Sequence, residues 1–206
     1  MATTKRSYRS GLREQQAEQT KRAVVQAAHD LFVANGWAAT GMRDVAAAAG
    51  VALETVYSHF SSKKGLLRAV GDAAAVGDDA PVPLAERPEF VTMGRGPRAA
   101  RVRAAARIAT AVAVRTTPVA KLLREAAPAD PEIAEMLAAT RERQRTDVAA
   151  AIELIIGRPP TAAERDGVWA VVSPEVHLLL VEQSGWTPEQ YEDWLAATLE
   201  GVLPRR

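Results

Sequence analysis

Two short amphipathic segments on either side of Gly50 place the strongest constraint on the fold of this chain. Apolar side chains recur at helical spacing in residues 40–50, and the same pattern returns in residues 53–60. We expect Thr40 to cap the first of these helices and Gly50 to end it. Two short helices joined by a glycine-containing turn form a helix-turn-helix, so the sequence predicts this motif near the N-terminus.

The rest of the chain also shows helical periodicity, and no segment alternates convincingly as a strand would. An apolar stripe begins near Gln15 and stops at Asn35-Gly36, and Ser62 can cap a further helix. The expected helices cover residues 15–35, 40–50, 53–60, 62–76, 97–116, 118–127, 131–156, 161–183 (kinked at Pro174) and 187–202. Capping signals mark the later starts, namely Asp130 before Pro131, Thr161 with Glu164, and Thr187 with Gln190. The predicted fold class is all-α, with about nine helices.

Residues 77–97 contain four prolines and three glycines, too many helix breakers for a long regular element. We interpret this stretch as the boundary between two modules. The first 14 residues are polar, basic and aperiodic, which indicates a flexible arm. We therefore expect a flexible basic arm over residues 1–17, a helix-turn-helix domain over 18–76 and a larger helical domain over 77–206.

Composition and motifs argue against several classes of protein. The chain has no cysteine, so disulfides and thiol nucleophiles are excluded. The histidines, His29, His59 and His177, lack metal-site spacing, and neither a phosphate-binding Gly-rich loop nor a nucleophile elbow occurs. We expect no metal, no cofactor and no enzymatic activity. Signal-peptide and membrane-span patterns are also missing, so we expect a cytoplasmic protein without a membrane partner.

Charge is distributed unevenly along the chain, although the net charge is only +1. Residues 1–70 contain ten basic and five acidic residues, whereas residues 71–206 contain sixteen basic and twenty acidic ones. A basic head on an acidic body is typical of a module that binds a polyanion joined to a different module.

The second short helix combines a core-facing stripe with a polar face. Val56 and Phe60 fall on the core-facing stripe, with Tyr57 at its margin. The polar side chains that remain free are Glu54, Thr55, Ser58 and His59. Because the second helix of a helix-turn-helix can lie in the major groove, this pattern favours binding to double-stranded DNA.

Six short pieces follow one another in order between residues 18 and 72. They are Ala28 with Leu31-Phe32, Gly36-Trp37, Thr40 with Val45-Ala46, Ala49-Gly50-Val51, residues 55–60 (TVYSHF), and Ser62-Lys63 with Leu66-Leu67. In this order and spacing they resemble the TetR family of transcriptional repressors. The resemblance implies a DNA-binding unit of three helices, joined by a fourth helix to a variable ligand-binding body. It also implies a homodimer on a palindromic operator.

The family's DNA contacts carry over to matching positions of this chain. The resemblance implies phosphate contacts by Thr40, Arg43, Thr55, Tyr57, His59 and Lys63, and places Leu53 and Glu54 nearest the bases. Two residues depart from the pattern. Ala52 stands where the family often has a capping Ser or Thr, and such a loss costs about 1 kcal/mol of helix stability. Glu54 is repelled by phosphates but can accept a hydrogen bond from a cytosine amino group.

The C-terminal helices are expected to hold a small hydrophobic effector and to form the dimer. Candidate pocket residues are Ile108, Val112, Leu122, Ile152, Trp169, Val172 and His177. Candidate dimer residues are Trp169, Leu179, Tyr191, Trp194, Leu195, Leu199 and Val202, on the helices that begin near Thr161 and Thr187. The function predicted for the whole chain is a repressor that the effector releases from its operator.

Other interpretations remain open at this level. His59 and Tyr57 can serve as core packing, His177 can be a tolerated polar residue, and Lys63 and Lys64 can form a solvated first turn. The arginines at 95, 98, 101, 103 and 107 are more typical of a solvated helix face than of a second DNA contact. The alternative function is a helical module that binds DNA or protein constitutively, without an inducer, and the least favoured one is an enzyme fused to a DNA-binding head.

Overall fold

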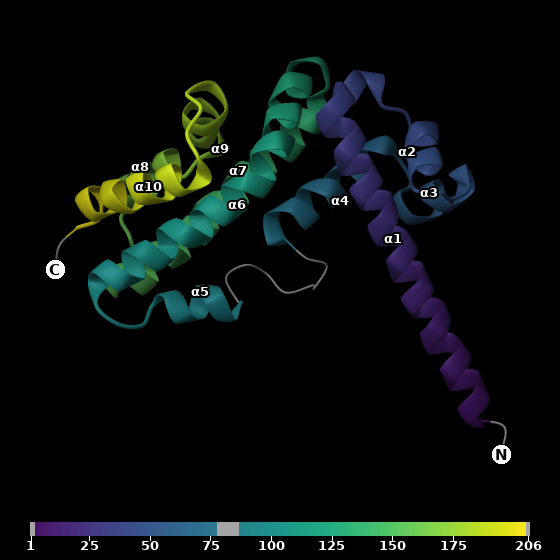
Figure 1. Ribbon diagram of the computed structural model, residues 1–206, viewed down its shortest axis with the longest axis horizontal. Coiled ribbons are helices and arrows are strands. Elements are labelled where there is room, and N and C mark those ends of the chain that lie inside the picture. The colour runs from purple at the N-terminus through teal and green to yellow at the C-terminus, as the bar shows by residue number, and fades with distance from the viewer. Residues whose placement is uncertain (1–2, 78–86, 205–206) are drawn as a thin grey trace. The chain divides into compact units, whose positions relative to one another are not determined.

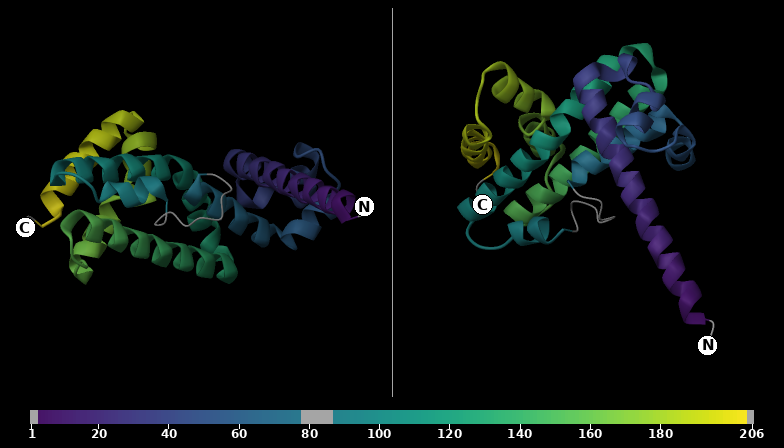
Figure 2. Two further views of the ribbon diagram at one scale, coloured as in Figure 1. Left: turned by 90° about the horizontal axis from the view of Figure 1, so that it is seen from below. Right: turned by 45° about the vertical axis from the view of Figure 1, so that its right-hand side comes forward.

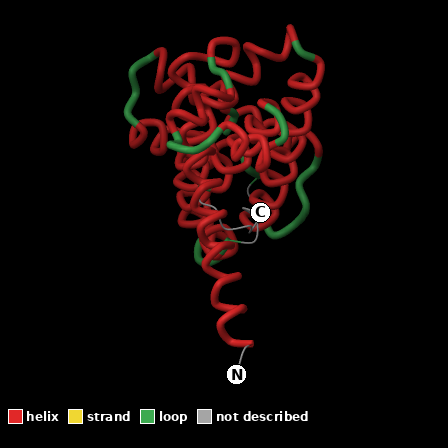
Figure 3. Tube along the Cα trace, turned by 90° about the vertical axis from the view of Figure 1, so that its right-hand side faces the viewer, coloured by secondary structure: helices red, strands yellow, loops and turns green. Residues whose placement is uncertain are grey.

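The structure, a computed structural model, describes residues 3–77 and 87–204, with side chains from residue 15 onward. Over these residues the chain is helical and contains no strand, as the tube in Figure 3 shows. This confirms the all-α fold class. The same residues form ten α-helices, a short 3-10 helix and a π-helix, against about nine helices expected (Figure 1).

The chain divides into two compact units, Met1–Ala73 and Ala74–Arg206. The helices of the first unit are α1 (Thr3–Ala39), α2 (Met42–Ala48), α3 (Leu53–Phe60) and most of α4 (Lys63–Val76). The regular part of α1 ends at Gly36, where φ is 80°, a left-handed conformation that glycine adopts without strain. The predicted stop at Asn35-Gly36 is therefore confirmed.

The start of α1 differs from the expectation. Its backbone is helical from Thr3, whereas the sequence predicts a flexible arm there. Residues 3–14 contain no proline, and their Lys, Arg, Leu and Glu residues have good helix propensity. The lack of apolar periodicity in these residues predicted a flexible arm, but it is also compatible with an exposed first part of α1.

Helices α1, α2 and α3 pack against one another, and their apolar stripes and that of α4 supply the core of the first unit. The most deeply buried side chains are Val24, Ala28, Phe32, Val45, Ala46, Val56, Leu66, Leu67 and Val70. Ser62 precedes α4, and its Oγ accepts a hydrogen bond from the N–H of Gly65 at 3.0 Å. This confirms Ser62 as the cap of that helix.

The second unit is built around α6, which packs against α5, α7, α9 and α10 (Figure 2). Its elements are α5 (Pro88–Met93), α6 (Arg98–Ala126), a 3-10 helix (Ala127–Ala129), α7 (Pro131–Ile156), α8 (Ala162–Val171), α9 (Pro174–His177), a π-helix (Leu178–Gln183) and α10 (Pro188–Val202). The short helix α5 lies within the breaker-rich stretch, where Phe90 and Met93 turn their side chains into the core.

Two expected boundaries in this unit are wrong. Pro118 lies inside α6 instead of starting a new helix. A proline in a helix interior costs about 3 kcal/mol, but the buried neighbours Thr117 and Val119 keep this part of α6 in the core. The helix expected over residues 161–183 is divided at Ser173, whose Oγ accepts from the N–H of Val176 at 3.3 Å. The sequence predicts only a kink at this place.

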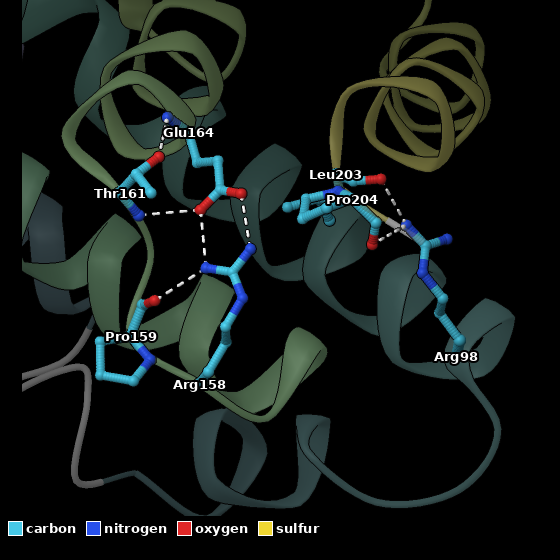
Figure 4. A network of polar contacts seen from close by, with 7 residues as sticks. All are labelled: Arg98, Arg158, Pro159, Thr161, Glu164, Leu203 and Pro204. Atoms are coloured by element: carbon cyan, nitrogen blue, oxygen red, sulfur yellow. Dashed lines mark hydrogen bonds and ion pairs between the residues drawn. The ribbon is translucent and has the colours of Figure 1, made fainter. Parts of the chain in front are cut away.

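The predicted caps of α7, α8 and α10 are confirmed. The side chains of Asp130, Thr161 and Thr187 each accept a hydrogen bond from the first turn of their helix. Figure 4 shows that Glu164, which completes the capping box of α8, is also held by both Nη atoms of Arg158, at 2.7 and 2.9 Å. These hydrogen bonds lower the pKa of Glu164 to about 2.

Candidate nucleic-acid interface and ligand cavity

The turn between α2 and α3 depends on Gly50. Its φ of 66° is left-handed, and the N–H of Val51 returns to the carbonyl of Ala46 at 3.0 Å. The chain reverses its direction here, and only residues 49–52 connect the two helices. Helix α3 therefore packs against α2. The predicted helix-turn-helix is therefore present.

Helix α3 presents a polar face, as the sequence predicts. Val56 and Phe60 are buried, whereas Glu54, Tyr57 and Ser58 are exposed. Leu53, Thr55 and His59 are half-buried, and Tyr57 leaves 47% of its surface exposed. The Ser58 hydroxyl donates to the Thr55 carbonyl at 2.8 Å, so one of these polar groups is already engaged within the helix.

Ala52 occupies the N-cap position of α3, and no side chain caps this end. We expect Ala52→Ser to stabilise the first unit by about 1 kcal/mol, because a serine hydroxyl can accept from the free N–H groups of the first turn. Thermal unfolding measures the effect. Ala47→Ser, an exposed substitution inside α2, is the matched control and should be neutral or slightly destabilising. A melting temperature of Ala52→Ser at or below the wild-type value would contradict the capping argument.

Thr40 has a different role from the one predicted. Its side chain is only 2% exposed, and its hydroxyl lies 3.0 Å from the carbonyl oxygens of both Leu31 and Gly36. It does not cap α2, whose N-cap is Gly41, with the Asp44 carboxylate accepting from the Gly41 N–H at 2.8 Å. Thr40 ties the end of α1 to the turn before α2, and its hydroxyl is not on the surface where a phosphate could reach it.

Lys63 also makes an internal contact. Its ammonium donates to the carbonyl of Trp37 and lies 4.1 Å from the centroid of the Trp37 ring. Burial lowers the pKa of Lys63, and the nearby Asp44 partly opposes this effect. The sequence predicted a phosphate contact for Lys63, and it predicted no contact between Lys63 and Trp37. Arg43, which is also in the predicted set, is exposed on α2.

A cavity of about 130 Å³ lies in the second unit among α5, α6, α7, α8 and α10. Five of the predicted pocket residues line it, namely Ile108, Val112, Ile152, Trp169 and Val172. Its wall is mostly apolar and also includes Phe90, Met93 and Leu199. The predicted residues Leu122 and His177 do not line the cavity. Leu122 is buried in α6, beyond Thr116, which is the last lining residue of that helix.

His177 belongs to the core behind the cavity wall. The ring is 4% exposed, its Nδ1 lies 3.0 Å from the Thr117 hydroxyl, and it meets Tyr191 edge-on at 5.0 Å between ring centroids. Burial lowers the pKa of His177. Helix α9 begins directly after Ser173. Ser173 and Pro174 line the cavity, whereas His177 does not.

The predicted dimer surface is only partly available to a partner. Tyr191, Leu195 and Leu199 are at most 2% exposed and belong to the core of the unit itself, so their assignment to a dimer surface is wrong. The stripe of α10 packs on α6, and a single sequence does not distinguish that contact from one with a second copy. Leu179 and Val202 are exposed, at 52% and 44%, whereas Trp169 and Trp194 are half-buried.

The arginines at the start of α6 are largely engaged within the unit. Arg98 donates to the carbonyls of Leu203 and Pro204 (Figure 4), and also pairs with Glu200. Arg101 donates to the carbonyl of Leu154, and Arg103 donates to the carboxylate of Asp193. These arginines fasten α6 to α7 and to the end of the chain.

Comparison with known proteins extends these observations. Residues 24–70 match the family model of the bacterial regulatory proteins of the tetR family, and these residues contain the helix-turn-helix described above. No protein of curated function matches the chain in sequence. No helix in the described residues is long and apolar enough to cross a membrane.

Solved structures share the fold over most of the chain. A TetR-family transcriptional regulator from Rhodococcus sp. is 19% identical, with a TM-score of 0.70 over 91% of this chain and all of its own. One from Mesorhizobium loti is also 19% identical, with a TM-score of 0.69 over 91% of this chain and 96% of its own. The multidrug binding protein EbrR, complexed with imidazole, is 18% identical, with a TM-score of 0.55 over 91% and 92%. Identities this low establish similarity of fold.

Residues 24–70, which contain the helix-turn-helix, therefore form a DNA-binding domain of the tetR family of bacterial regulatory proteins. The chain as a whole shares its fold with solved TetR-family transcriptional regulators.

Proposed function

We propose that this chain is a cytoplasmic, homodimeric repressor that a small hydrophobic effector releases from a palindromic operator. The observation that carries the proposal is the combination of two features in one chain. One is a helix-turn-helix whose second helix exposes polar side chains, and the other is an apolar cavity in the second unit. DNA binding is assigned to the first feature and control to the second.

On the DNA side, α3 offers its exposed face to the major groove. Glu54 in the first turn faces the bases, and Tyr57 and Thr55 contact phosphates with their hydroxyls. Arg43 supplies a positive charge from α2. His59 stays in the proposed contact set, because its ring lies beside that of Phe60 but remains partly exposed.

On the control side, the effector acts only through its different affinities for two states of the protein. Two heads of a dimer enter successive major grooves when they lie about 34 Å apart along the DNA. An effector that binds more tightly to a form with another head spacing lowers the affinity for the operator. The largest factor by which it can do so is the ratio of its affinities for the two forms. Leu179 and Val202 remain the proposed dimer contacts, because they are apolar and exposed in one protomer.

Salt-dependent DNA binding tests the proposal. The operator is first selected from fragments of the source genome with the purified full-length chain. Arg43→Ala should weaken binding to all sequences similarly and reduce the slope of log affinity against log salt by about 0.9, the share of one phosphate contact. Arg107→Ala, an exposed arginine of α6, serves as the matched control and should leave both quantities unchanged. Wild-type affinity and slope in Arg43→Ala would overturn the placement of α2 and α3 on DNA.

The second candidate is a DNA-binding protein without an effector. The cavity favours the ligand-controlled function, because an apolar void of this size loses packing contacts that a ligand can restore. A ligand that raises the melting temperature and also releases the operator supports control by an effector. Ligands that bind without any effect on DNA affinity would favour the second candidate.

A further inference from the structure

The cavity of the second unit has one charged side chain among its lining residues, the carboxylate of Asp147 on α7. Its other polar lining residues are Thr116, Gln144, Trp169 and Ser173. Two of these are already satisfied within the protein. The Thr116 hydroxyl donates to the carbonyl of Val112 at 2.9 Å, and the Ser173 hydroxyl accepts the capping hydrogen bond of α9.

The remaining polar groups on the cavity wall make no hydrogen bond in the described part of the chain. This holds for the half-buried Asp147 carboxylate and Gln144 amide, although the Arg143 guanidinium acts on Asp147 electrostatically. Trp169 Nε1 is fully buried and also lacks a hydrogen-bond partner. Buried polar groups in proteins are nearly always paired, so the buried indole N–H marks an incomplete site, and the half-buried Asp147 and Gln144 on the same wall remain accessible to a ligand.

Asp147 and Gln144 lie apart from the apolar end of the cavity. The short connection through residues 127–130 makes α6 and α7 antiparallel, and Arg101 reaches the carbonyl of Leu154 at 3.3 Å. Residues earlier in α7 than Leu154 therefore lie beside residues later in α6 than Arg101. Counted from this contact, Asp147 and Gln144 lie beside the middle of the stretch of α6 that lines the cavity, residues 105–116. The end near Arg101 and Leu154 is apolar, with Met93 beside α7 and Leu203 beside the start of α6.

The charges around Asp147 do not neutralise it fully. Burial raises the pKa of the Asp147 carboxyl, and the Arg143 guanidinium opposes this rise only in part. Arg145 lies over the Trp169 ring at 4.1 Å, and its charge is shared with Glu142 and Asp166. Neither arginine lines the cavity. The void is therefore a place where a positive charge is favoured over a neutral group, and a negative charge is disfavoured.

We propose that the effector is a protonated amine on an apolar body the size of about one aromatic ring. Its ammonium lies against the Asp147 carboxylate and the Gln144 side-chain oxygen, and its body fills the apolar end. The volume of about 130 Å³ is close to that of the roughly 150 Å³ cavity known to hold benzene. This inference rests on the proposed function, since it assumes that the cavity receives the effector.

Three probes that share a phenyl ring and differ in charge test the charge preference. Benzylammonium, benzyl alcohol and benzoate are titrated into the full-length protein at neutral pH, and their dissociation constants are measured by calorimetry. Because a hydrogen bond to a charged group is stronger than a neutral one, benzylammonium should bind about tenfold more tightly than the alcohol. Benzoate should bind most weakly.

Asp147→Asn removes the charge and keeps the shape of the side chain. We expect it to abolish the preference for benzylammonium while benzyl alcohol still binds, which also shows that the cavity remains folded. The matched control is Glu153→Gln, an exposed acid of the same helix outside the cavity, which should retain the tenfold preference.

The outcomes separate the two levels of the argument. Equal binding of amine and alcohol by the wild type, or a preference that survives in Asp147→Asn, would overturn the amine assignment and leave an effector cavity in place. If none of the three probes binds, the amine assignment fails together with the proposed role of the cavity. DNA binding by the first unit is tested separately and is not affected by either result.

Discussion

Gly65→Ala should destabilise the first unit by about 3 kcal/mol and abolish operator binding. A β-carbon at this position would lie far inside van der Waals contact with the carbonyl oxygen of Phe60, the last residue of α3. Backbone atoms cannot rotate away as a flexible side chain can, so α4 must shift relative to α3. Thermal unfolding and DNA binding of the full-length variant measure the two effects.

Gly167→Ala is the matched control for this prediction. Gly167 lies inside α8, and a β-carbon there would meet nothing within 4 Å. The same change should therefore stabilise the second unit by up to about 1 kcal/mol, because alanine favours the helix. If Gly65→Ala unfolds at the wild-type temperature, the close approach between Gly65 and the Phe60 carbonyl does not exist as described.

Ala109→Leu is expected to weaken binding of cavity ligands at least 100-fold while leaving DNA binding intact. Ala109 lines the cavity from α6, and three further carbon atoms there would occupy much of its volume of about 130 Å³. Filling a void restores packing contacts, so the variant should be as stable as the wild type or more stable. Calorimetry with benzyl alcohol gives the affinity, and release of the operator by a ligand should disappear.

The control for this variant is Ala111→Leu, an exposed position of the same helix that does not line the cavity. It should bind ligand and respond to it as the wild type does. Undiminished ligand binding in Ala109→Leu would show that ligands enter the protein elsewhere.

The first unit could be predicted well from the sequence because its signals are local. A left-handed glycine at Gly36 and another at Gly50 end their helices, and the spacing of Val56 and Phe60 determines which face of α3 is buried. The contacts of Thr40 and Lys63 could not be predicted in this way. Each depends on a residue distant in the sequence, the carbonyl of Leu31 for Thr40 and that of Trp37 for Lys63.

The second unit was less predictable because its contacts are between distant segments. An apolar stripe such as that of α10 indicates burial, but it does not tell whether α6 or a second copy covers it. Asp147 gave no sequence signal at all, since one acid within a charged helix looks like any solvated residue. Its unusual position arises only when the faces of α6, α7 and α8 enclose a common space.

The contact between Lys63 and Trp37 has an optical consequence. Trp37 is the single tryptophan of residues 1–73, and its indole ring carries an ammonium group on one face. In a chain whose other three tryptophans are replaced by phenylalanine, the tryptophan fluorescence would come from this ring alone. Its emission would follow the separation of α1 from α4 in real time, without an attached dye.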